Sequence, residues 1–363
     1  MGRHLLEQGD NIVILGFASP GTGSLAITFN DTGTNGLTLD FLVLKGTTPV
    51  SIDSIGATGG FNVLLQLEET NNSLTQVTIS GSEFFQLGSL PGQSNHVDGV
   101  VTDIAATATS PKTIHSSLTL IDASTTTGGL SIEAGATNTS GAGNFQNGGS
   151  LNANVTITYT GLTIKGGSGT DAIENDAKNG KVTDGNGNGD IVILAGAGAK
   201  ATLGTGSGDQ VAVGDSNLGT NETAGSALGD KVAFGAAKTA DLFVGTGAEA
   251  GSTINNAIIG KTKVVNAADG MQIDFTVVTT SHFIADETTV VASATTLKAA
   301  ENAAVNAFGG SGVVYFSFHG NEYFIATDNA EAAVSSSDAI VKLVGVTDFH
   351  HATNNFGLVT LHV

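Results

Sequence analysis

The sequence predicts an all-β fold, a right-handed parallel β-solenoid or β-roll with a small C-terminal α+β cap. Three observations lead to this prediction. Glycine supplies 51 of 363 residues, yet 40% of the chain is hydrophobic, which is enough apolar surface for a folded core. Short apolar segments alternate with Thr and Ser, as in strands that bury one face. A glycine- and aspartate-containing element also recurs between residues 166 and 251.

The first predicted domain, residues 1–160, is a succession of short strands separated by Gly, Asn, Thr and Ser. A pattern in it repeats in part, because residues 73–81 (SLTQVTISG) are echoed by residues 117–124 (SLTLIDAS), which lead into residues 128–133. We expect these segments to be successive rungs of one stacked sheet. The alternative is an ordinary β-sandwich with Thr-rich strands. The clearest strands are expected at 11–15, 25–29, 37–42, 61–67 and 154–159.

The second predicted domain, residues 161–262, contains the recurring element. Residues 166–174 (GGSGTDAIE) match the nonapeptide G-G-x-G-x-D-x-U-x, a repeat that binds calcium in β-rolls. The Asp-x-apolar part then returns four times, and the first two steps are 19 residues each, close to one coil of two nine-residue half-turns. The later steps are 21 and 11 residues. The recurring aspartates are Asp171, Asp190, Asp209, Asp230 and Asp241.

These residue types suit Ca²⁺, which takes six to eight oxygen ligands. The glycines permit tight turns and leave their carbonyls pointing at the gap between neighbouring turns, to which the aspartates bring charge. Gly167 and Gly169 are accordingly expected to belong to the metal site. We therefore expect calcium ligands at Asp171, Asp190 and Asp209, with Asp230 and Asp241 less regular in spacing. The alternative is that the aspartates only cap turns.

Residues 184–190 (DGNGNGD) resemble the start of an EF-hand loop. The twelfth position, where that loop needs a glutamate, is Ala195. The segment is therefore interpreted as a turn of the roll that offers carbonyl oxygens.

The third predicted domain, residues 263–363, mixes helix and strand. Residues 292–308 are rich in alanine and stop at Gly309-Gly310, which predicts a helix. A hairpin is expected from residues 313–318 through a turn at 319–321 into 323–326, followed by a strand at 338–345. We expect the helix and the hairpin to cap one end of the solenoid.

Composition argues against several classes of function. With 33 acidic and 13 basic residues the net charge is −20, which does not suit a nucleic-acid partner. The chain has no cysteine, so it forms no disulfides and no thiolate metal sites. The sequence shows no H-E-x-x-H, G-x-S-x-G or G-x-x-x-x-G-K-[ST] motif, so we do not expect an enzyme. No membrane-spanning segment and no N-terminal Sec signal are expected either.

The rungs at 73–81 and 117–133, the nonapeptide at Gly166 and the tail at 315–348 together resemble the C-terminal regions of S-layer proteins of Gram-negative bacteria. Those proteins belong to the RTX class, which is exported by type I secretion. The resemblance covers about residues 70–350 and implies an extracellular, cell-surface protein that folds with calcium, carries an uncleaved C-terminal secretion signal and assembles into arrays. Many RTX proteins carry long tandems, whereas only one nonapeptide is complete here, so the number of ions stays open.

The function predicted first is a secreted structural protein that self-assembles into a surface layer or filament with calcium. Its partners would be copies of itself and a cell-surface polysaccharide. The alternative is a type I secreted adhesin or carbohydrate-binding module, because Thr- and Asn-rich faces can bind sugars, although the chain has no Trp and three Tyr. A secreted lyase or protease on a β-helix would need an active-site cluster that the sequence does not show.

Overall fold

The structure is a computed structural model, and its contacts divide the chain into two compact units, residues 1–187 and 188–363. The predicted division at residues 160 and 262 stays a prediction. The residues that the structure describes are 12–16, 24–33, 36–45, 49–69, 72–91, 99–102, 112–136, 138–139, 155–196, 198–213, 231–233, 240–244, 262–265, 272–275, 284–327, 330, 332–334, 338–346, 354–355 and 358–360.

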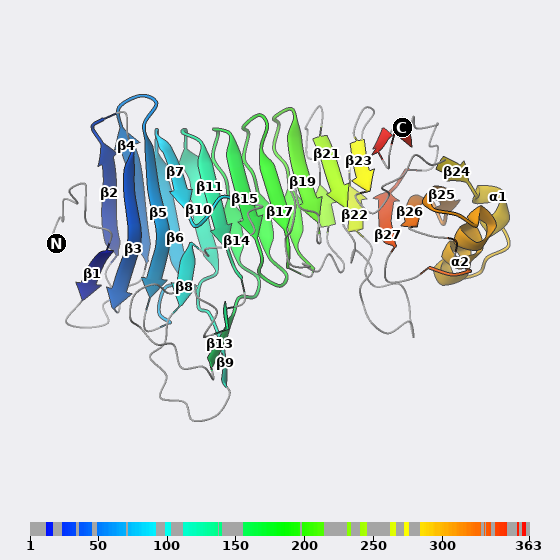
Figure 1. Ribbon diagram of the computed structural model, residues 1–363, viewed down its shortest axis with the longest axis horizontal. Coiled ribbons are helices and arrows are strands. Elements are labelled where there is room, and N and C mark those ends of the chain that lie inside the picture. The colour runs from blue at the N-terminus through cyan, green and yellow to red at the C-terminus, as the bar shows by residue number, and fades with distance from the viewer. Residues whose placement is uncertain are drawn as a thin grey trace. The chain divides into compact units, whose positions relative to one another are not determined.

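In the first unit, the strands are shared between two parallel sheets (Figure 1). One sheet has the order β1-β3-β5-β7-β11-β15, with β8 also paired to β5, and the other has the order β2-β4-β6-β10-β14-β16. The strands are β1 Ile12–Gly16, β2 Leu25–Asp31, β3 Leu37–Lys45, β4 Val50–Gly56, β5 Phe61–Glu69, β6 Gln76–Gly81, β7 Phe84–Leu87, β8 Val100–Thr102, β10 Leu120–Thr126, β11 Leu130–Ala134, β14 Thr163–Lys165, β15 Asp171–Asn175 and β16 Lys181–Thr183.

The two echoed segments are neighbours in one of these sheets, as predicted. Strands β6 and β10 pair in parallel, with Val77 opposite Ile121, and both side chains are buried. Parallel pairing along both sheets sets the ordinary sandwich aside, because sandwich strands are antiparallel. The fold is therefore mostly β with parallel sheets, which is compatible with a β-solenoid.

Apolar residues from the two sheets meet in the core of this unit. Phe29 of β2 and Phe85 of β7 are fully buried and pack edge to face, with ring centroids 5.4 Å apart. Each strand contributes a few such side chains, and burying each one stabilises the fold by roughly 1.5–3 kcal/mol.

Three further strands pair with one another in a small third sheet. It joins β12 (Asn138–Thr139), β13 (Val155–Thr158) and β9 (Lys112–His115). The strand predicted at 154–159 therefore forms, but it pairs with β9 and β12.

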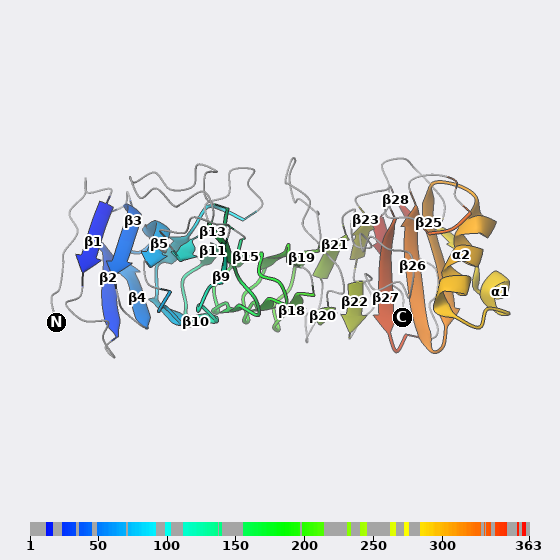
Figure 2. The ribbon, with the colours of Figure 1, turned by 90° about the horizontal axis from the view of Figure 1, so that it is seen from below.

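In the second unit, strands again alternate between two sheets until the C-terminal region (Figure 2). The orders are β17-β19-β21-β23-β29-β28 and β18-β20-β22-β27-β26-β25-β24, parallel up to β23 and β27. The strands are β17 Ile191–Leu194, β18 Lys200–Thr202, β19 Asp209–Val213, β20 Lys231–Ala233, β21 Ala240–Val244, β22 Thr262–Val265, β23 Gln272–Phe275, β24 Ile284–Asp286, β25 Gly312–Phe318, β26 Asn321–Thr327, β27 Ala339–Val344, β28 Asn354–Asn355 and β29 Leu358–Thr360.

The predicted hairpin is confirmed in strands β25 and β26. Its two turn residues, His319 and Gly320, both have positive φ, 49° and 73°, as a type I′ turn requires. Because this turn matches the twist of the flanking strands, the two strands pair along their whole length.

The predicted helix ends where expected but begins later. Helix α2 spans Leu297–Phe308, so the predicted start at Ala292 is wrong. The Thr296 side chain accepts a hydrogen bond from the Ala299 N–H at 3.2 Å and caps the helix there. Gly309 ends it in the left-handed conformation. A four-residue helix, α1 (Thr288–Val291), precedes it.

Helix α2 packs on one face of the hairpin. Ala304 and Val305 share a buried cluster with Phe316, Tyr323 and Ile325. Phe316 and Tyr323 stack with ring centroids 5.4 Å apart. Among the described residues, no helix is long and apolar enough to cross a membrane.

Candidate metal centre

Backbone hydrogen bonds hold the glycine-rich turns of the first unit against one another. In the turn after β14, the Ser168 N–H donates to Thr126 O at 3.0 Å, at the end of β10 in the preceding coil. On its other side, Gly167 O accepts from Asn186 N at 3.2 Å. These bonds are only possible because the turns lie in direct backbone contact.

The glycines of the nonapeptide make this contact possible. A Cβ at Gly167 would lie 2.1 Å from Thr126 Oγ1, and a Cβ at Gly169 would lie 2.3 Å from Gly128 O. Any side chain at either position would push the turns apart. The structure thus gives Gly167 and Gly169 a packing role, while a role of their carbonyls in metal binding stays a prediction.

The aspartate of the nonapeptide stands where earlier coils have apolar side chains. In register along the sheet, Phe85 pairs with Leu130, and Leu130 pairs with Asp171. All three side chains are fully buried. Asp171 Oδ2 accepts a hydrogen bond from Gly167 N at 2.7 Å, within its own turn. Asp171 therefore makes the turn-capping bond of the alternative interpretation, and its role as a ligand stays a prediction.

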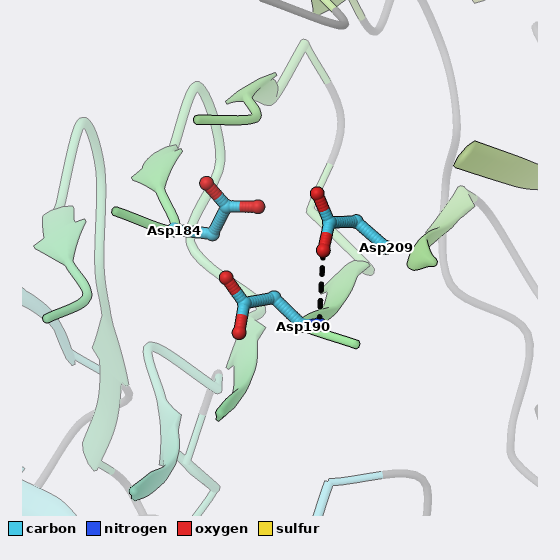
Figure 3. Close-up of side chains that lie close together, drawn as sticks. All are labelled: Asp184, Asp190 and Asp209. Carbon is cyan, nitrogen blue, oxygen red and sulfur yellow. Dashed lines mark hydrogen bonds between the residues drawn. The ribbon is translucent and has the colours of Figure 1, made fainter. Parts of the chain in front are cut away.

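In the second unit, the structure brings Asp190 and Asp209 together (Figure 3). Asp190 directly precedes β17, and Asp209 begins the neighbouring strand β19. The Asp190 N–H donates to Asp209 Oδ1 at 3.2 Å, and the Gln210 N–H donates to Asp190 O at 2.7 Å. The spacing of 19 residues thus places the two aspartates side by side on adjacent strands.

Asp184 joins this pair. It begins the seven-residue turn that Asp190 ends, and its side chain is also buried. One carboxylate oxygen from each of Asp184, Asp190 and Asp209 lies within 4.8 Å of the other two (Figure 3). We call these three residues the aspartate triad.

The electrostatics of the aspartate triad favour a bound cation. Asp209 is 1% exposed, and its Oδ2 has no hydrogen-bond partner among the described residues. Burial raises the pKa of Asp209, and the N–H groups that donate to it from Asp190 and Gly189 partly offset this. Three carboxylates this close repel one another when ionised, so they need protons or a cation. An all-oxygen donor set suits Ca²⁺ or Mg²⁺.

The two remaining predicted ligands do not extend the triad in the described part of the chain. Asp241 is in register with Gln210, whereas Ala240 is opposite Asp209. In the sequence, this one-residue offset between Asp241 and Asp209 is signalled by the short step of 11 residues from Asp230 to Asp241. Asp230 lies outside the described residues, and β20, which follows it, belongs to the sheet of β18.

Another buried carboxylate, Glu322, belongs to β26. Burial and, to a smaller extent, the negative charge of Asp286 raise the pKa of Glu322 to about 7, although the Ser317 hydroxyl donates to it at 2.6 Å. Since the unfolded pKa is 4.5, the folded state holds the extra proton between these two values, and stability falls as pH rises from about 4.5 to about 7.

We expect Glu322→Gln to remove this dependence. The variant should match the wild type near pH 4.5 and exceed its free energy of unfolding above pH 7 by up to about 3 kcal/mol. Urea unfolding of both proteins at pH 5 and pH 8, at one fixed calcium concentration, measures the difference. Parallel pH profiles for the two proteins would contradict it.

Two comparisons with known proteins found no match. No family model matches the chain, and no curated protein matches it. The fold and the aspartate triad therefore carry the functional inference.

Proposed function

We propose that the protein is a secreted structural protein that self-assembles into an extracellular surface layer or filament, and that calcium stabilises its right-handed β-roll. The observation that carries the proposal is the aspartate triad, in which Asp184, Asp190 and Asp209 gather three buried carboxylates. The resemblance of the rungs, the nonapeptide and the tail to S-layer proteins supports the same function.

Calcium fits the aspartate triad by charge and by ligand type. Three carboxylates supply part of the six to eight oxygens that Ca²⁺ takes, and backbone carbonyls or water would supply the rest. When bound, the ion would neutralise the buried charge and tie together two successive coils, because Asp190 and Asp209 stand at the starts of adjacent strands. Metal binding and folding of these coils would then be one linked equilibrium.

The sheets also offer a route to self-assembly. Among the described strands, β1 and β2 each end a sheet and pair on one side. An edge strand presents free backbone donors and acceptors to another chain. Copies that add at such edges would lengthen the stack, as in other repeat folds in which each coil contacts its neighbours.

Electron microscopy and sedimentation of the purified full chain, with calcium and after chelation, test the proposal. We expect ordered assemblies with calcium, their loss on chelation and their return when calcium is restored. Magnesium at the same concentration is the control, because it prefers a smaller octahedral site. Assembly and circular dichroism that do not change with calcium would refute the calcium role, and a monomer under all conditions would refute the structural one.

A further inference from the structure

Four lysines stand in register on one sheet of the second unit. Lys200 of β18 pairs with Lys231 of β20, Lys231 pairs with Lys263 of β22, and Lys263 pairs with Lys342 of β27. These strands lie side by side in Figure 2. We call this column the lysine ladder.

The ladder positions belong to the outer face of the sheet. Lys200 is exposed and Lys342 is partly exposed, whereas their strand neighbours Ala201 and Leu343 are buried in the core. Thr202, two positions along from Lys200 and so on the same face, is exposed as well. At Lys200 this face therefore combines an ammonium group with the Thr202 hydroxyl.

The ladder ends where α2 covers the sheet. Lys342 is in register with Tyr323, which belongs to the buried cluster under α2. The Lys342 Nζ lies 5.6 Å from the centre of the Tyr323 ring. From Lys200 to Lys342 the column is about 14 Å long, since neighbouring strands are ~4.8 Å apart.

Folding alone does not favour this arrangement. Like charges directly opposite each other on neighbouring strands are destabilising. The chain has 13 basic residues against 33 acidic ones, and four of the 13 occupy one column. A repulsive feature that local stability does not explain is typical of a binding surface.

We propose that the lysine ladder binds a linear anionic polysaccharide, with carboxylated or sulfated sugars lying along the column. A polymer with repeating negative charges matches lysines that recur at the same register position on four neighbouring strands, and the threonine hydroxyl can hydrogen-bond sugar hydroxyls. This binding surface goes beyond the structural role proposed above and does not depend on it.

Two other occupants fit less well. For a second copy of the chain, a complementary row is missing, because the described strands contain no exposed row of four acidic residues in register. For a nucleic acid, the ladder lacks arginine, the residue best suited to bidentate phosphate contacts.

The test measures binding of the full chain to dextran sulfate, with neutral dextran as the uncharged control, at fixed calcium and varied salt. The ladder variant is Lys200→Gln with Lys342→Gln. Its matched control, Lys178→Gln with Lys298→Gln, removes the same charge from residues that are not part of the ladder. We expect at least ~10-fold weaker binding of the ladder variant, a shallower salt dependence and less than ~2-fold change in the control. The melting temperature of the ladder variant should be unchanged or higher, since repulsion is relieved.

Equal losses in both variants, or equal binding of neutral dextran, would overturn the proposal. Tighter ladder-dependent binding of single-stranded DNA would replace it with a nucleic-acid surface. A ladder variant that changes sedimentation but still binds dextran sulfate would make the column a contact between copies. Assembly with calcium is measured separately, so failure of this proposal and failure of the structural function give different results.

Discussion

Replacing Gly185 with alanine is expected to lower the free energy of unfolding by about 3–5 kcal/mol. Gly185 has φ +93°, and a Cβ there would lie 1.8 Å from Gly167 O, in the turn of the preceding coil. The Gly167 carbonyl is held in place because it accepts from Asn186 N at 3.2 Å. The turns would have to separate, and the hydrogen bonds between them would be lost.

Gly161→Ala is the matched control for this prediction. Gly161 has φ +72°, but a Cβ there would have nothing within 4 Å. It should therefore cost only the left-handed strain, roughly 1–2 kcal/mol. Urea unfolding of the two variants at saturating calcium measures the difference. Equal losses of free energy of unfolding in the two variants would contradict the prediction. Glycine at position 185 would then be required only by its positive φ and not by the contact between the turns.

Much of the fold was predictable because its signals are local. The rungs at β6 and β10 have the same alternation of apolar residues with Thr, so they bury equivalent faces and pair in register. The turn at His319-Gly320 and the helix stop at Gly309 depend on a few neighbouring residues. The pairing of β13 with β9 was not predictable, because residues 112–115 lie outside the echoed segments and no repeat marks them.

Two of the three residues of the candidate site were predictable, because the repeat spacing between them equals one coil. Asp190 and Asp209 meet because 19 residues return the chain to the same position on the next strand. Asp184 was missed as a ligand, since the path of the turn from Asp184 to Asp190 brings it close and no repeat marks it. Asp241 follows a shorter step, and its strand pairs one residue out of line with Asp209.

The effect of Asp209→Asn on the free energy of unfolding should have opposite signs without and with calcium. Without calcium, we expect the variant to be more stable than the wild type by about 1–3 kcal/mol, because a buried charge among like charges is removed. With calcium at 100 times its dissociation constant, the wild type should gain about 2.7 kcal/mol, and the variant should gain far less. Thermal and urea unfolding with chelator and with calcium give both differences, and calorimetric titration gives the affinity.

Asp171→Asn is the matched control, because Asp171 opens β15 as Asp209 opens β19 and is equally buried. Asparagine keeps an oxygen that can accept from Gly167 N, so the turn cap survives. We expect its calcium-dependent gain to stay within ~0.5 kcal/mol of the wild type. A loss as large as in Asp209→Asn would make Asp171 a ligand as well. If neither substitution changed the calcium response, the aspartate triad would not be the metal site, and the three carboxylates would have to be kept neutral by protons.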